Sequence, residues 1–273
     1  IDIGSLPARE IYDFVSVEGN IFETLSAQLS WQRVTLNRGL FPTDGASTVL
    51  SVSSTIPGSD LSYYRLNVRQ RYYQPLTQNL VFGFQGELGY LDAYGDTKET
   101  PFFQNFYAGG PRSLRGFESN TLGPRSTDAP CYEFNYAEGT CPNLLDTDGD
   151  GELDTPYYNP YANQTSRYRD APIGGNIKIE GSLQLIFRLP FIEDQRSLRS
   201  AFFFDFGNVF SDNCKDYQIN CSEPSVDDLR YSYGVGLTWI TGFGPMSLAI
   251  AKPTNAGPRE RTEEFQFTAV NVF

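Results

Sequence analysis

Residues 177–187 read IKIEGSLQLIF, and apart from Gly181 and Ile186 this stretch alternates between apolar and polar side chains. Ile177, Ile179, Leu183, Leu185 and Phe187 occupy one set of alternate positions. Lys178, Glu180, Ser182 and Gln184 occupy the other set. Successive side chains of a β-strand point to opposite faces, so this period predicts a strand with one apolar face and one polar face.

The same alternation recurs along the whole chain and predicts an all-β protein of about ten antiparallel strands. No helix of ordinary length competes with these strands in the sequence. The ten predicted strands are residues 25–33, 49–56, 65–71, 80–90, 102–107, 177–187, 198–210, 231–240, 246–251 and 264–273.

The polar faces of these strands indicate which side meets water. They carry charges, Gln and many glycines at mid-strand, whereas the apolar faces are large, aromatic and continuous from strand to strand. This pattern favours a transmembrane β-barrel with its apolar face toward lipid and a watery lumen. A soluble β-sandwich, with the apolar faces packed together inside, is the alternative that alternation alone leaves open.

Composition narrows the function classes. Aromatic residues reach 15%, with 21 Phe and 17 Tyr against one Met, as is typical of strands and of membrane-interface belts. The net charge is −12 without any basic cluster, which argues against a nucleic-acid partner. The chain has no His, and we find no convincing pair of nucleophile and base, so we expect no enzymatic activity.

Two long polar connections stand out, at about 108–175 and at 211–229. Loops of this length are uncommon unless they are functional or disordered, so the first is the prime functional candidate. Each contains one close cysteine pair, Cys131 with Cys141 and Cys214 with Cys221. Polar surroundings favour local disulfides formed in an oxidising compartment over free structural thiols.

Residues 109–124 read GGPRSLRGFESNTLGP, which resembles the signature loop of the BamA family of barrel-assembly insertases. The core of the match is Leu114, Arg115, Gly116 and Phe117, and the flanking residues make it specific. Further segments resemble the family in the same order, namely LNRG at 36–39, FPTDG at 41–45, IPGSD at 56–60 and FFDFG at 203–207.

The resemblance implies a sixteen-stranded barrel of the Gram-negative outer membrane, of which residues 1–273 would be the C-terminal part, without the periplasmic domains. It implies that the long extracellular loop folds into the lumen, where Arg115 grips the wall carboxylate Asp205 through a bidentate fork. The position of a second wall carboxylate in the family is Gln184 here, and Glu180, four residues earlier on the same face, is the candidate substitute.

The resemblance also implies a function. The barrel would insert and fold client β-barrel proteins, in contact with outer-membrane lipid and, through the periplasmic domains, with the lipoproteins of an assembly complex. A polypeptide-secretion channel or a passive pore of the same superfamily is the alternative. Phe265, Phe267 and Phe273 resemble the aromatic C-terminal strand that forms the family's seam, although any last strand facing lipid needs such residues.

The acidic stretch DTDGDGELD at 146–154 has the oxygen-ligand spacing of an EF-hand loop, with Asp146, Asp148, Asp150 and Asp154 as candidate Ca²⁺ ligands. Tyr157 stands where the bidentate Glu is expected, so any site would be weak, and a solvated acidic loop is the alternative.

A calcium site here predicts heat on calorimetric titration of the loop with millimolar Ca²⁺, lost when Asp146 and Asp148 become Asn. Titration of the unchanged loop without heat would leave only the solvated loop.

Overall fold

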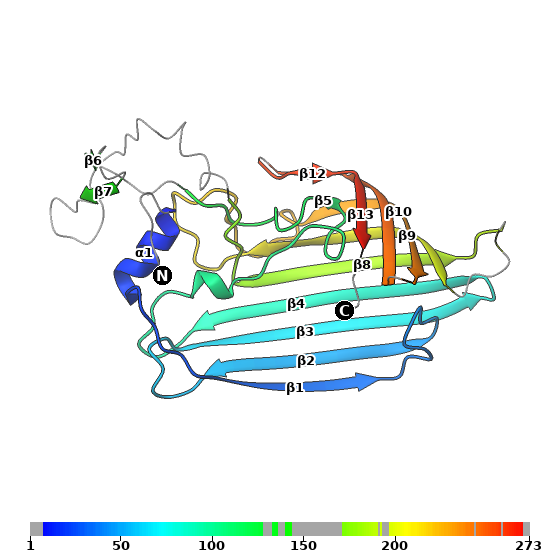
Figure 1. Ribbon diagram of the computed structural model, residues 1–273, viewed down its shortest axis with the longest axis horizontal. Helices are drawn as coiled ribbons and strands as arrows, with labels where there is room; N and C mark the ends of the chain where they lie inside the picture. The colour runs from blue at the N-terminus through cyan, green and yellow to red at the C-terminus, as the bar shows by residue number, and fades with distance from the viewer. Residues whose placement is uncertain are drawn as a thin grey trace.

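The computed structural model describes residues 8–127, 133–135, 140–143, 171–190, 192, 197–242, 244–257 and 259–269. One antiparallel sheet of nine strands dominates it, and each strand lies beside the next along the chain (Figure 1). In order the strands are β1 (Ser26–Val34), β2 (Gly45–Thr55), β3 (Tyr63–Thr77), β4 (Leu80–Ala93), β8 (Ile177–Phe187), β9 (Leu198–Phe210), β10 (Arg230–Thr241), β11 (Gly244–Pro253) and β13 (Phe265–Ala269).

The outer face of this sheet is apolar and exposed. One cross-strand row runs from β8 to β13 through Leu185, Phe202, Val235, Ile250 and Phe265. These side chains are 38%, 53%, 43%, 65% and 60% exposed, although they are among the most apolar in the chain. The apolar face points outward, as in a barrel surrounded by hydrocarbon, so the predicted orientation for a transmembrane β-barrel is confirmed and a sandwich with these apolar faces packed inside is excluded.

The inner face of the last strands is built from small residues around a single ring. Phe203 of β9 packs against Ala249 and Ala251 of β11, and all three are buried. Gly234 lies between them on β10, and a Cβ there would come within 2.0 Å of the Ile250 carbonyl oxygen and 2.8 Å of the Phe203 ring. The absence of larger side chains leaves room for a loop to enter from the chain's longest connection.

The described parts of the two long connections lie at one end of the sheet, and the turn between β3 and β4 lies at the other (Figure 1). The helix α1 (Arg9–Glu18) lies at the long-loop end (Figure 1). Phe14 of α1 joins a buried cluster with Leu91, Phe106 and Val209, and its ring meets that of Phe102 at 5.5 Å. No helix in the described residues is long and apolar enough to cross a membrane.

One predicted strand is wrong. Residues 102–107 form a short 3₁₀ helix, η1 (Phe102–Gln104), followed by a single bridge from Phe106 to Gly175. Phe102 and Phe106 pack into the cluster around Phe14 of α1 instead of facing lipid. The alternation in 102–107 therefore reflects packing inside the protein. The main sheet of the described residues therefore has nine strands, where about ten were predicted.

Adjacent positions on β2 provide a test of the orientation. Leu50 faces outward and is 39% exposed, whereas Ser51 faces inward and bonds to Ser30. We predict that Leu50→Arg lowers the free energy of unfolding in lipid vesicles by about 2–4 kcal/mol, because it places a charge in the hydrocarbon region. Ser51→Arg should cost much less, since its side chain can reach water. Equal losses in urea titrations of the two variants would contradict the orientation.

Candidate functional site

The candidate site is the signature loop, residues 109–124, where it lies against the inner wall of the sheet. Its tip is the two-residue strand β5 (Gly116–Phe117). Gly116 has a φ of +89°, and a Cβ on it would lie 3.2 Å from the Ala251 Cβ and 3.3 Å from the Pro253 Cδ. Only glycine combines this backbone conformation with so close an approach to the wall.

Arg115 grips the wall through Asp205 of β9. Its Nε and Nη2 atoms donate to the two carboxylate oxygens at 2.7 Å each, and its backbone N–H donates to the same carboxylate at 3.2 Å. Asp205 is fully buried, so without the guanidinium it would be an uncompensated charge. The structure thus places together the two residues that the resemblance paired.

Two further wall residues fix the direction of the guanidinium. Its Nη2 also donates to Ser182 Oγ on the neighbouring strand β8 at 3.0 Å. The guanidinium carbon lies 3.4 Å from the centre of the Phe203 ring, a close cation–π contact. Arg115 therefore bridges two strands and covers the inner ring, which a lysine could not do with one ammonium group.

Glu180 also holds the loop, but through a different residue. Ser113 donates a short hydrogen bond to Glu180, and Lys178 forms an ion pair with Glu180 at 3.0 Å. Among the described residues, no hydrogen bond or ion pair joins Glu180 to Arg115; Ser182 accepts from the guanidinium instead. Glu180 therefore belongs to the loop's seat without replacing the second carboxylate partner that the family gives the arginine.

Leu114 and Phe117 anchor the loop by burial. They are 1% and 0% exposed and join the cluster that contains Leu91, Leu122 and Val209. Burying two such side chains contributes on the order of 3–6 kcal/mol, which is comparable with the polar grip of Arg115. Sequence reasoning named these two residues from the resemblance, and the structure shows what they contact.

The opposite side of the loop tip meets the segment that leads into the last strand. Gly116 and Phe117 pair with Glu263 and Thr262 of the two-residue strand β12 (Thr262–Glu263). Gln266 of β13 accepts a hydrogen bond from the Gly116 N–H at 3.3 Å and donates to the Phe117 carbonyl at 2.7 Å. Sequence reasoning missed Gln266, because a glutamine between two phenylalanines reads as an ordinary lumen-facing residue.

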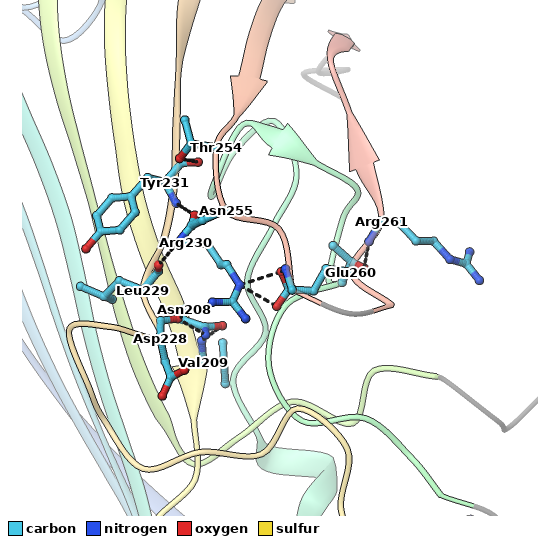
Figure 2. A network of polar contacts seen from close by, with 12 residues as sticks. Asn208, Val209, Asp228, Leu229, Arg230, Tyr231, Thr254, Asn255, Glu260 and Arg261 are labelled. Atoms are coloured by element: carbon cyan, nitrogen blue, oxygen red, sulfur yellow. Dashed lines mark hydrogen bonds and ion pairs between the residues drawn. The ribbon is translucent and has the colours of Figure 1, made fainter.

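The segment before β12 is fixed by a second buried ion pair, shown in Figure 2. Arg230 Nε lies 2.9 and 2.7 Å from the two Glu260 carboxylate oxygens, and the Glu260 side chain is 1% exposed. Asn255 accepts from the Tyr231 N–H at 2.9 Å and donates to the Leu229 carbonyl at 2.7 Å. These contacts attach the connection between β11 and β13 to the start of β10.

Residues 6–273 match the family model for the Omp85 superfamily domain. The chain belongs to the Omp85 superfamily. It is 30% identical over 263 residues to outer membrane protein assembly factor BamA of Neisseria meningitidis serogroup B (strain MC58), covering 90% of this chain and 28% of that protein. It is 25% identical over 189 residues to the mouse sorting and assembly machinery component 50 homolog, covering 68% and 31% of the two.

Among solved structures, this Omp85 chain is similar to BamA from Haemophilus ducreyi lacking POTRA domains 1–3. The TM-score is 0.70 at 28% identity, and the match covers 94% of this chain and 46% of that one. The chain thus spans less than half the length of each of these relatives. The resemblance to the BamA family that the signature loop indicated is confirmed.

The helix α1 forms hydrogen bonds with residues of both long connections. Glu10 accepts hydrogen bonds from the Thr127 backbone N–H at 3.1 Å and from its hydroxyl at 2.7 Å. Burial raises the pKa of Glu10 in spite of these bonds. Tyr217 donates a short hydrogen bond to Asp13, and burial with this bond raises the pKa of Tyr217. The helix therefore fastens residues from both long connections.

The remaining predicted residues are only partly covered. The disulfide between Cys214 and Cys221 is confirmed. Cys131, the acidic stretch from Asp146 to Asp154 and Phe273 lie outside the described residues, so the second disulfide and the calcium site stay predictions. Within the described part of the chain, no group of three or more acidic or cysteine side chains could hold a metal ion. Phe265 and Phe267 lie on the outer face, 60% and 52% exposed.

The grip on Asp205 predicts a large effect of Arg115→Ala. Removing one partner of a buried ion pair typically costs about 3–5 kcal/mol, so the loop should leave the wall and become sensitive to proteases. Arg112→Ala is the matched control, because Arg112 is an exposed arginine of the same loop. Limited proteolysis in lipid nanodiscs should show faster cleavage within 109–124 for the first variant only. Identical cleavage of the two variants would refute the grip.

Proposed function

We propose that this chain forms the C-terminal part of the membrane barrel of an outer-membrane protein assembly factor. In this role it inserts and folds client β-barrel proteins in the Gram-negative outer membrane, without covalent chemistry. The observation that carries the proposal is the signature loop held to the inner wall and to the last strand, in a chain similar to BamA over 90% of its length.

The last strand supplies the surface for such a function. β13 pairs with β11 on one side, and its other edge has no strand partner within the described residues. A free strand edge presents backbone N–H and C=O groups that an incoming strand can pair with. The exposed rings of Phe265 and Phe267 lie next to this edge, where a client strand would also need to face lipid.

The partners follow from this mechanism as parts of the same proposal. Outer-membrane lipid contacts the apolar outer face, and client barrel strands pair at the β13 edge. Assembly lipoproteins would bind through segments of the longer relatives that this chain does not span. No observation in the described residues favours a secretion channel or a passive pore.

The proposal predicts that the complete protein in lipid vesicles speeds the folding of a urea-unfolded client barrel. The readout is a gel run without heating the samples, in which the unfolded client migrates more slowly than the folded client. Arg115→Ala should reduce the initial rate several-fold, because the loop no longer positions the last strand, and Arg112→Ala should retain it. Vesicles that pass ions or unfolded polypeptide without speeding client folding would instead support a channel.

A further inference from the structure

The side chain of Gln266 connects the last strand to the signature loop. Gln266 lies on the inner face of β13, opposite Ala249 of β11, and is 2% exposed. Its amide oxygen accepts from the Gly116 N–H at 3.3 Å, and its amide nitrogen donates to the Phe117 carbonyl at 2.7 Å. One side chain thus satisfies two backbone groups of consecutive loop residues, as a neighbouring strand would.

Both backbone groups are in a buried place. Gly116 is buried and Phe117 is 0% exposed, so water does not readily replace the glutamine. Each buried polar group left unpaired costs about 1–3 kcal/mol, and the loss of Gln266 would affect one donor and one acceptor together. If the loop withdrew, the Gln266 amide would keep only its 3.4 Å hydrogen bond to the Glu263 carboxylate of its own segment, so the cost falls on both sides of the contact.

The backbone leading into β13 is held by the same two loop residues. Thr262 and Glu263 of β12, four and three residues before Gln266, pair with Phe117 and Gly116. On the loop's far side, the Glu118 N–H donates to the Arg261 carbonyl at 3.0 Å, and the Arg261 N–H donates to Thr121 Oγ1 at 3.1 Å. Residues 116–121 and 261–266 therefore form one hydrogen-bonded unit.

The other attachment of this unit to the wall is independent of Gln266. Arg115 holds Asp205 on β9, and Arg230 holds Glu260 just before Arg261 (Figure 2). Within the described part of the chain, β13 pairs with β11 on one side. Contacts that fix the start of β13 therefore contribute to how firmly it is held against β11.

We propose that Gln266 is a positioning residue that makes the order of the last strand depend on whether the signature loop is seated. With Arg115 on Asp205, the Gln266 amide is matched and the start of β13 is held against β11. When the loop leaves the wall, the amide loses both of its loop partners and the start of β13 loosens. This inference rests on the proposed function, because it assigns the loop the task of controlling the edge where client strands pair.

The test is hydrogen–deuterium exchange of the complete protein in nanodiscs, read by mass spectrometry on peptides from 109–118 and 262–269. In the wild-type background, Arg115→Ala should speed exchange in both peptides, by about tenfold or more in 262–269. Gln266→Met, which keeps the volume and loses both hydrogen bonds, should speed exchange in 262–269 although Arg115 and Asp205 are intact.

The coupling itself is measured by the double variant. In the Gln266→Met background, adding Arg115→Ala should speed exchange in 262–269 by less than it does in the wild-type background, because one of the contacts between the loop and β13 is already lost. A residue that only stabilised β13 locally would give additive effects instead. Additive effects, or wild-type protection of 262–269 in Arg115→Ala while 109–118 opens, would overturn the proposal.

Thr268→Val is the matched control on the same strand and the same face. Thr268 lies opposite Ser247, and its buried hydroxyl has no hydrogen-bond partner among the described residues, so the change removes no bond seen in that part of the chain. The Thr268→Val variant should show wild-type exchange in 262–269. If Gln266→Met changed this exchange no more than Thr268→Val does, the proposal would fail. Should Gln266→Met not fold, Gln266→Leu, which also removes the amide without adding a charge, should give the same pattern.

Exchange needs no client protein, so this test and the test of the proposed function fail separately. Coupled exchange without accelerated client folding would refute the assembly role and retain the coupling. Accelerated client folding with additive exchange would do the reverse.

Discussion

The arrangement depends on a buried carboxylate that the wall of the sheet cannot neutralise by itself. Asp205 is fully buried on the inner face, and its neighbours across the sheet are the uncharged Ser182 and Ser232. The charge is compensated only when Arg115, ninety positions away in the sequence, comes down from the long connection. An unpaired charge in such a place is costly, so release of the loop would leave Asp205 as an unpaired buried charge in addition to losing the contacts of Arg115.

The lumen wall is shaped to receive that arginine. Phe203 provides a ring face for the guanidinium, and the nearest residues on β10 and β11 are glycine and alanine. The outer face of the same strands carries Phe202 and Phe204, which are exposed as lipid-facing residues must be. Alternate residues of β9 thus face the hydrocarbon, and the residues between them contact the loop, because successive side chains of a strand point to opposite faces.

The loop tip joins two parts of the sheet that would otherwise be linked only through the strands between them. On one side it holds β8 and β9 through Ser182, Glu180 and Asp205. On the other side it holds β12 and β13 through backbone pairing and Gln266. Within the described residues the last strand is paired on one side, so this second attachment contributes to how firmly its start is held.

The sequence by itself determined the strand positions, which face meets lipid, and the pairing of Arg115 with Asp205. The first two follow from a local period, and the third from a family motif whose partners are charged and therefore conspicuous. The same period gave a wrong prediction at 102–107, where the apolar residues pack on α1. Alternation indicates which side chains avoid water, but it does not indicate whether lipid or another part of the protein covers them. Only the tertiary structure decided that Ser113 forms a hydrogen bond with Glu180 and that Gln266 forms hydrogen bonds with the backbone of Gly116 and Phe117. These contacts join common polar residues across 67 to 150 positions, and nothing in a linear pattern indicates which backbone group such a residue will meet once the chain has folded.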